Sequence, residues 1–385
     1  MRLDILIYAH DGRGLGHVSR SLGIGMALRR LYPELKILFI SGSTFTGELL
    51  GRAPLDWLKL PSYKTEVVGG KSRGVQGNSM FLDRELGELR GQALANVVAL
   101  YKPRLVLVDH TPQGKHRELL PALKSAPEDC RWVMGVRGVV GAVPQAKKES
   151  TRSIFQNSYS DLLWYGDSAV LGNHHLRVLK EQYGLEPQEC GYVARLGEYM
   201  YFNEIVTGNS QKLWAGVVSV PWLGEKTFPF LQCLAAALSG LGGAYGMWCL
   251  FVDDGLGVMR EKVDSLFAGL THCHLRRPGG DYGKELMRAR CAVIYGGYNS
   301  LVDVLYAKIP SVVILRDMRD QEQQEHVVNL QKHLAGALKG VSEDDISSER
   351  LQALLVEQLD QTASFDHRVN TDGAKRVALY LHSKL

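Results

Sequence analysis

A glycine-rich segment near the N-terminus contains the first residues whose types and spacing could support chemistry. Residues 10–20 read HDGRGLGHVSR and follow an apolar run, 3–8, that is typical of a buried strand. A helical pattern then extends from residue 16 or 17 to about residue 31. Glycines let the backbone turn tightly and approach a ligand, and a helix start offers unpaired N–H groups and a partial positive charge. We therefore predict a ligand-binding turn. Its residues are Gly14, Gly16 and Arg20.

His17 stands at the start of this helix, and the sequence allows two interpretations of it. A histidine with a pKa near 6.5 can take a proton from a hydroxyl group or water at neutral pH, which would make His17 a general base. Alternatively, His17 caps or packs against the helix start. Its place after the first strand, with Arg20 three residues later, favours the base. The second catalytic candidate is Asp109, which ends the predicted strand 105–108.

A Rossmann dinucleotide site fits this segment less well. The glycine spacing is not GxGxxG, and the second predicted strand, 36–40, is followed by Ser41 and Gly42 instead of an acidic residue that would bind ribose.

A second glycine-rich turn, GGYNS, begins at residue 296 after the predicted strand 292–295. A strand–turn–helix of this kind binds anions at the helix start, and its glycines and amides suit a pyrophosphate. Either Asn299 or Ser300 could cap the helix. Asp303, one turn later, could accept hydrogen bonds from a ribose diol, the alternative being a solvated carboxylate. The predicted donor-binding residues here are Gly296, Gly297, Asn299, Ser300 and Asp303.

A polar segment, 316–324, follows the next predicted strand, 311–315. Its amides and carboxylates could hold sugar hydroxyl groups, and its arginines could meet phosphate. The alternative is an exposed, charged helix start, which is common. The candidate ligand-binding residues in it are Arg316, Gln321 and Gln323.

The elements that must position these residues alternate between short apolar strands and amphipathic helices, which favours parallel sheets covered on both faces. The chain has 385 residues, more than one core usually serves, so we expect two domains that divide between about residues 192 and 213. The segment 61–78 is rich in Gly, Lys and Ser and is predicted to be a long, mobile loop. The other predicted strands are 56–60, 132–136, 162–165, 217–220, 247–252 and 272–275, and the other predicted helices are 82–101, 227–238, 299–306, 322–334 and 372–385.

Composition excludes several classes of function. The net charge is +4 and basic residues are scattered among acidic ones, so we expect an anionic ligand and no nucleic acid. No stretch approaches about 18 apolar residues, so no transmembrane segment is expected. The N-terminus lacks the pattern of a signal peptide. Six well-separated cysteines are typical of buried free thiols in a reducing compartment, and we predict a cytoplasmic protein.

The segment GLGHVSR from residue 14, the segment GGYNS from residue 296 and the pair Glu322–Gln323 together resemble the family 28 glycosyltransferases, which include the enzyme that adds N-acetylglucosamine to the peptidoglycan lipid precursor. The resemblance implies an α/β GT-B fold, in which two Rossmann-like domains with parallel sheets face each other across a cleft. We expect an acceptor domain over 1–200, a nucleotide-sugar domain over 201–370, and a C-terminal helix over 371–385 that packs back on the first domain.

The resemblance also implies the chemistry. A hydroxyl or amine of a small or lipid-linked acceptor would attack a nucleotide-diphosphate sugar, the co-substrate, and a direct displacement would invert the anomeric centre. The family's ribose-binding acid falls on Asp303, and its sugar-binding glutamine falls within 321–324, with Gln323 the best match. Neither a metal nor another cofactor is expected. Peripheral contact with a membrane stays open.

One departure from the family keeps two alternatives open. The family starts its second domain with a strand, a serine and a glycine-rich loop, and here Pro221 and Trp222 follow Ser219 and Val220 at that place. Pro221 removes a backbone hydrogen-bond donor and Trp222 adds bulk, so either transfer is redirected or the chain is a non-catalytic nucleotide or sugar binder. A further alternative comes from the first turn, because GxGHxxR also resembles the nucleotide-sugar hydrolases of nonulosonic acid synthesis, in which His17 would activate water.

Overall fold

The computed structural model describes the backbone and most side chains of the chain, and for the hairpin strands β4 and β5 the backbone only. The described residues are 2–10, 15–68, 71–75, 80–139, 149–205, 212–221, 226–253, 259–316, 321–334, 336–361 and 368–385. The chain divides into two compact units. The first unit comprises 1–203 and 370–385, and the second comprises 204–369.

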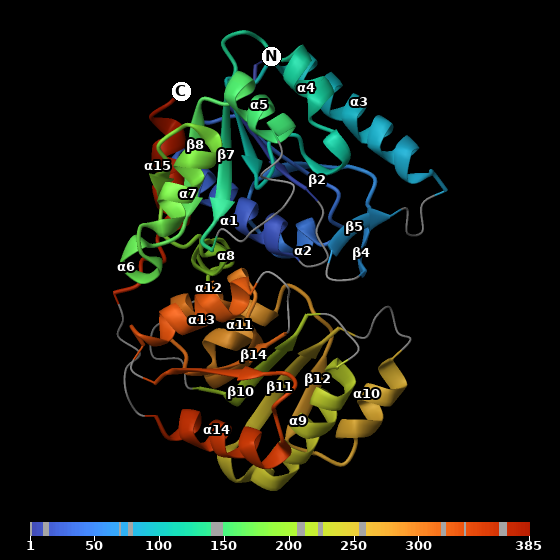
Figure 1. The fold of residues 1–385 in the computed structure, drawn as a ribbon. Helices are drawn as coiled ribbons and strands as arrows, with labels where there is room; N and C mark the ends of the chain where they lie inside the picture. The colour runs from blue at the N-terminus through green and yellow to red at the C-terminus, as the bar shows by residue number, and fades with distance from the viewer. Residues whose placement is uncertain are drawn as a thin grey trace. The chain divides into compact units, whose positions relative to one another are not determined.

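The first unit is built on a seven-stranded parallel sheet with the strand order β3-β2-β1-β6-β7-β8-β9 (Figure 1). Its inner strands are continuous apolar runs, which is what a sheet buried on both faces requires. The strands are β1 Ile5–Ala9, β2 Ile37–Ser41, β3 Asp56–Lys59, β6 Leu105–Asp109, β7 Arg131–Arg137, β8 Asp161–Tyr165 and β9 Gln188–Glu189. The chain leaves β1 toward β2 and returns later to β6 on its other side, so the strand order reverses between β1 and β6.

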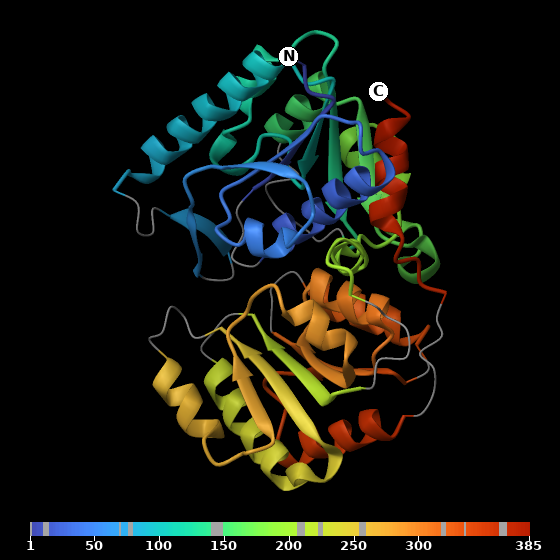
Figure 2. The ribbon, with the colours of Figure 1, turned by 180° about the vertical axis from the view of Figure 1, so that it is seen from behind.

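The helices of the first unit form separate groups. Helix α1 packs with α2, α8 and α15, and Figure 2 shows α15 beside α1, whereas α3 packs with α4 and α5 with α7. Helix α15 is held by the stacking of His382 on Tyr32, with ring centroids 3.8 Å apart. The helices are α1 Gly16–Leu31, α2 Thr46–Leu50, α3 Asp83–Tyr101, η1 Lys115–Arg117, α4 Leu120–Ser125, α5 Glu149–Ser158, α6 Ser168–Leu171, α7 His174–Tyr183, α8 Arg195–Phe202 and α15 Gly373–His382.

The segment 61–78 differs from its prediction as a structureless loop. It contains an antiparallel hairpin of β4 Lys64–Val68 and β5 Lys71–Val75. Two glycines separate the strands in the sequence, which is a signature of a two-residue hairpin. The prediction was wrong because these strands are too polar to give the apolar alternation by which half-buried strands are usually found.

The second unit repeats the architecture with a six-stranded parallel sheet of order β12-β11-β10-β13-β14-β15, which reverses between β10 and β13. The strands are β10 Trp214–Val220, β11 Met247–Val252, β12 Cys273–Arg276, β13 Ala289–Tyr295, β14 Ser311–Leu315 and β15 Leu338–Ser342. The helices are α9 Thr227–Leu241, η2 Gly242–Tyr245, α10 Arg260–Phe267, α11 Tyr282–Met287, α12 Tyr298–Ala307, α13 Glu322–Gln331 and α14 Ser348–Asp360.

One helical stretch, Thr227–Tyr245, has the length and composition of a membrane span. In the structure its apolar side chains belong to the core of the second unit. Phe230, Leu234 and Leu238 are buried in the cluster that also contains the sheet residues Trp248 and Ile314. Packing in a core therefore accounts for its apolar character.

Candidate active site

The reversal of strand order creates a place for a ligand in each unit, because helices leave in opposite directions at the carboxyl ends of the two central strands. In the first unit His10 follows β1, and Asp109 and His110 end and follow β6. In the second unit Pro221 follows β10 and Gly296 follows β13. The sequence-predicted residues of both glycine-rich turns thus lie at the two positions where open α/β sheets bind ligands.

The two catalytic candidates of the first unit are in direct contact. His17 Nδ1 lies 2.5 Å from Asp109 Oδ2, although 92 residues separate them in the chain. The Asp109 carboxylate is 2% exposed and the His17 side chain 18%. The N-cap of α1 is Leu15, so His17 does not cap the helix. The buried carboxylate instead orients the imidazole and can stabilise the imidazolium that forms when a histidine base takes up a proton.

Arg20 holds the same carboxylate in place. Its Nε and Nη2 donate to Asp109 Oδ1 at 3.1 and 2.9 Å, and Nη2 also donates to Oδ2 at 2.8 Å. The Arg20 side chain is 2% exposed, so it acts on Asp109 and is not presented to solvent. Gly16, the other described residue of the predicted turn, is the first residue of α1.

Two histidines that the sequence interpretation missed complete this cluster. The rings of His10 and His17 lie against each other, tilted by 39° with centroids 3.9 Å apart, and the His110 ring lies 5.3 Å from that of His17. The Nδ1 atoms of His10 and His110 are buried and have no hydrogen-bond partner among the described residues. The available signal was that each histidine lies two residues after the end of a predicted strand, 3–8 or 105–108.

The histidines of this cluster are uncharged at neutral pH. Burial, the largest cause, lowers the pKa of all three well below 6.5. Nearby cations add to this, Lys115 for His10 and His17, and Arg137 for His17 and His110. A neutral imidazole at His17 is the form that can accept a proton.

The same side chains could be taken for a metal site, since ligand atoms of His10, His17 and Asp109 all lie within 4.8 Å of one another. However, both Asp109 oxygens already accept hydrogen bonds from Arg20, and Oδ2 also contacts His17 Nδ1. The arrangement suits a histidine–carboxylate pair better than a metal centre.

In the second unit the turn after β13 leads into α12, but its capping differs from expectation. The N-cap is Gly297, and no side chain caps the helix, so neither Asn299 nor Ser300 has that role. Both lie within the first turn of α12. The Gly296 and Gly297 amides donate to the backbone oxygens of Ile314 and Tyr295. The prediction was wrong because the backbone at Gly297, two residues before Asn299, already has the extended conformation of an N-cap.

Gln323 and Gly296, predicted from separate motifs, come together at the carboxyl ends of β13 and β14. A Cβ placed on Gly296 would lie 3.2 Å from Gln323 Oε1 and 3.0 Å from Leu315 Cδ2. A Cβ on Gly297 would meet no described atom within 4 Å. Gln323 Oε1 is buried and has no hydrogen-bond partner among the described residues. A buried acceptor beside an open glycine is an arrangement that a ligand hydroxyl group can complete.

Asp303 lies on α12 near Tyr282 at the start of α11. Burial, together with the Asp303 carboxylate, raises the pKa of the Tyr282 hydroxyl. Tyr282 is therefore a neutral hydroxyl group next to the predicted ribose-binding acid, and the sequence interpretation did not include it.

Arg316, for which the sequence left open a phosphate ligand or an exposed, charged helix start, has a buried side chain. Its side chain is 7% exposed. Nη2 donates to Thr227 Oγ1 at 3.1 Å, Nε lies 3.5 Å from Glu343 Oε2, and the guanidinium lies over the ring of Tyr295. The Tyr295 hydroxyl donates to Glu343 Oε1 at 2.7 Å. Glu343, which follows β15, thus contacts both Arg316 and Tyr295.

The remaining predicted residues are less informative. Gln321 is exposed at the N-cap of α13 and has a left-handed backbone, with φ of 49°. Gly14 and Trp222 lie outside the described residues, whereas Pro221 is described and exposed. The six cysteines form no disulfide.

Solved structures show a shared fold over the whole chain. No protein-family profile and no curated protein sequence matches. The UDP-GlcNAc 2-epimerase of Methanocaldococcus jannaschii is 12% identical, with a TM-score of 0.63 over 99% of this chain and 100% of that one. The chain has the GT-B fold. MurG of Acinetobacter baumannii is 13% identical (TM-score 0.53; 99% and 95% covered), and Medicago truncatula UGT71G1, complexed with UDP-glucose, is 11% identical (TM-score 0.58; 100% and 98% covered). The sequence prediction of two Rossmann-like domains with parallel sheets is confirmed.

Proposed function

We propose that this GT-B protein is a glycosyltransferase that moves a sugar from a nucleotide-diphosphate sugar to an acceptor hydroxyl group or amine. The observation that carries the proposal is the contact between His17 and the buried Asp109. The motif resemblance to family 28, and the same fold in MurG and in a protein complexed with UDP-glucose, support the reaction class. The site and not the fold must carry the function, since this fold serves several chemistries.

The His17–Asp109 pair supplies a general base. With Nδ1 directed to Asp109, the Nε2 atom is left to take a proton from the acceptor. As that proton moves, Nδ1–H donates to the carboxylate, which stabilises the imidazolium that forms. The acceptor oxygen or nitrogen bonds to the anomeric carbon while the bond from that carbon to the diphosphate oxygen breaks. A single displacement inverts the anomeric centre.

The second unit supplies the donor site in this proposal. The start of α12 and the open face of Gly297 receive the diphosphate, whose charge the helix dipole stabilises without a metal. Asp303 and Tyr282 bind the ribose, and Gln323 Oε1 accepts a hydrogen bond from a sugar hydroxyl group. The donor-binding groups thus come from α11, α12 and α13.

The test has two stages. Thermal unfolding is first followed with a panel of nucleoside diphosphates and their sugars, because a ligand that binds only the folded state raises the midpoint. Transfer by the best donor is then compared between the wild type, H17A and H174A, a change of an exposed histidine on α7 of the same unit. We expect H17A to lower turnover roughly 10²- to 10⁴-fold with unchanged nucleotide binding, and H174A to have no effect.

Hydrolysis of the nucleotide-sugar is the second candidate, because His17 could activate water in place of an acceptor. Product analysis separates the two reactions. Sugar released at the same rate with and without any acceptor identifies a hydrolase. Saturable nucleotide binding with no turnover on a broad donor and acceptor panel identifies a non-catalytic binder, and unchanged transfer by H17A removes His17 as the base.

A further inference from the structure

The loop that follows β6 has an unusual backbone beside the histidine cluster. His110, His116 and Arg117 all have left-handed φ angles, of 76°, 52° and 64°. Non-glycine residues are strained in this region and concentrate where the surrounding structure enforces a functional geometry. The loop is held at both ends, since the His110 amide donates to the Gly135 oxygen and the Leu119 amide to the Gln113 oxygen.

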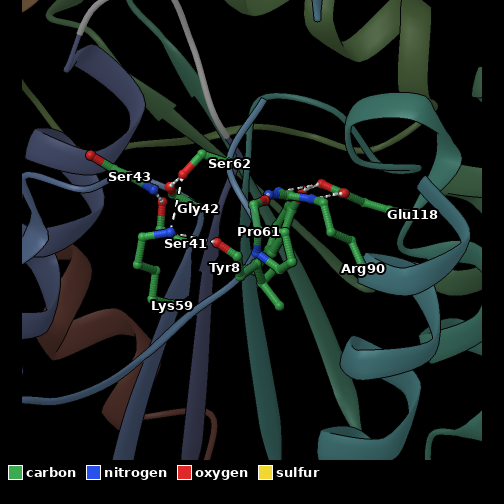
Figure 3. Close-up of polar contacts among 10 residues, drawn as sticks. Tyr8, Ser41, Gly42, Ser43, Lys59, Pro61, Ser62, Arg90 and Glu118 are labelled. Carbon is green, nitrogen blue, oxygen red and sulfur yellow. Dashed lines mark hydrogen bonds and ion pairs between the residues drawn. The ribbon is translucent and has the colours of Figure 1, made fainter. Parts of the chain in front are cut away.

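A buried ion pair fixes the end of this loop (Figure 3). Glu118 accepts hydrogen bonds from Arg90 Nε at 2.5 Å and Nη2 at 3.0 Å, and also from the Tyr8 hydroxyl on β1. Both side chains of the pair are 0% exposed. Arg90 also donates to the Pro61 oxygen. The loop is thus anchored by α3 and β1. The anchor is an ion pair, even though burying two charges costs more desolvation free energy than burying apolar side chains of the same size.

This anchoring presents Lys115 to the histidine cluster. Lys115 is half-buried, and its charge acts on both His10 and His17. Arg137, the last residue of β7, acts in the same way on His17 and His110. Since Arg20 neutralises Asp109, the described charges around the three imidazoles add up to a positive local field.

The imidazoles themselves have unused hydrogen-bonding capacity. The carboxylate of Asp109 is taken by Arg20 and His17. The buried Nδ1 atoms of His10 and His110 find no partner among the described residues. Ring nitrogens without partners in a positive field can donate to a ligand oxyanion, and a bound oxyanion would in turn favour the imidazolium.

We propose that His10 and His110, together with Lys115 and Arg137, bind an anionic group of the acceptor, a phosphate or a carboxylate, and that His17 beside them stays neutral as the base. The inference rests on the proposed transfer reaction and names its acceptor class. The anionic group lies beside the base, so that the hydroxyl group to be glycosylated is close to it on the same molecule. The strained loop and its Glu118 anchor exist to hold Lys115 there.

The field also argues against a cation at this place. A divalent metal would add two positive charges next to Arg20, Lys115 and Arg137, and it would have to displace Arg20 from Asp109. An anion lowers the electrostatic energy of the same groups. An anion site predicts that sulfate raises the unfolding midpoint, whereas a cation site predicts that a divalent metal does.

Sulfate is the probe for the test, because it remains a dianion between pH 6 and pH 8. Thermal unfolding of the full chain is measured against sulfate at constant ionic strength, with chloride as the balancing ion. We expect a saturable rise in the midpoint for the wild type and for K124Q, which removes an exposed lysine on α4. For K115Q we expect the apparent sulfate affinity to fall roughly tenfold.

The pH dependence adds a second readout. Sulfate does not titrate in this range, so an affinity that rises from pH 8 to pH 6 reports proton uptake by the histidines, and H110N should reduce that rise. No saturable effect in the wild type, or an equal effect in K115Q, would overturn the proposal. Saturable stabilisation by Zn²⁺ that H10N abolishes would replace it with a metal site.

Nucleotide binding separates this inference from the proposed function. K115Q should keep the wild-type response to the best nucleoside diphosphate. If sulfate fails to bind while nucleotide binding and transfer persist, the anion subsite is refuted and the transferase proposal stands. If sulfate binds as expected but no nucleotide does, the transferase proposal fails instead.

Discussion

Arg20 and Asp109 form a buried ion pair in which three hydrogen bonds of 2.8 to 3.1 Å connect the guanidinium to both carboxylate oxygens. Both side chains are 2% exposed. Arg20 lies on α1, the helix after β1, and Asp109 ends β6. The ion pair therefore connects the two central strands of the first sheet, and the same carboxylate contacts His17. Positioning of the base and stability of the unit therefore depend on the same contact.

Asp109→Asn should destabilise the first unit strongly. The substitution leaves the Arg20 charge buried without its partner, which typically costs about 3–5 kcal/mol of the free energy of unfolding. Urea unfolding of the wild type and the variant at pH 7.5 measures the difference. Glu88→Gln is the matched control, because its partner Arg84 is 90% exposed and such pairs contribute little.

The double variant R20M/D109N distinguishes the ion pair from a general packing defect. With both charges removed, part of the lost stability should return, so the two single effects should not add. Additive effects would show that the electrostatic coupling between the two side chains is weak.

Acid pH should destabilise the protein through the three cluster histidines. Their pKa values in the folded state lie well below 6.5, whereas in the unfolded chain they return to about 6.5. Below that pH the unfolded state binds more protons, so stability is lost as the pH falls. Each group contributes up to about 1.4 kcal/mol per pH unit between its two pKa values.

The measurement compares wild type with the double variant H10N/H110N between pH 8 and pH 5. Carboxylates contribute to both curves, so the difference between the two slopes isolates the histidines. The variant should lose less stability below pH 6.5, and H174N should follow the wild type. Parallel curves for the wild type and the double variant would contradict the neutral, buried state of His10 and His110.

The strands and helices on either side of both glycine-rich turns could be predicted from the sequence. Central parallel strands are buried on both faces, so β1 and β13 appear as continuous apolar runs, and the helices after them have clear periodicity. By contrast, β15 was not predicted, because its residues LKGVS include Lys339 and Gly340 and form neither an apolar run nor an apolar–polar alternation. Glu343, which follows it, was missed with it.

The histidine cluster could not be assembled from local patterns. His10 and His110 each have only one informative neighbour in the sequence, the strand that precedes them. They meet because β1 and β6 pair, with α1 placing His17 between them, and strand order is a property of the whole sheet. The same holds for Lys115, whose loop conformation depends on the distant Arg90.

Alanine should reduce stability at Gly296 and ligand binding at Gly297. In Gly296→Ala the new methyl group meets Leu315 and Gln323 at 3.0 to 3.3 Å, and such overpacking costs about 1–3 kcal/mol. In Gly297→Ala it meets no described atom, and φ of −68° suits any residue. Gly297→Ala should therefore keep wild-type stability but weaken nucleoside diphosphate binding, by roughly tenfold if the methyl group blocks the ligand. Thermal unfolding and calorimetric titration provide the two numbers, and wild-type affinity in Gly297→Ala would contradict the assignment of this turn.

Gln323→Met tests the donor sugar contact. Gln323 Oε1 is a buried acceptor without a described partner, and an unsatisfied group of this kind costs about 1–3 kcal/mol. Methionine has a similar shape and removes that cost, so the unliganded variant should be at least as stable as the wild type. Binding of a nucleotide-sugar should weaken roughly tenfold, whereas binding of the nucleoside diphosphate should not change, because only the sugar reaches this atom. Gln324→Met, at the exposed neighbouring position, should change neither affinity. Equal losses for the nucleotide and the nucleotide-sugar in Gln323→Met would place Gln323 at the diphosphate instead of the sugar.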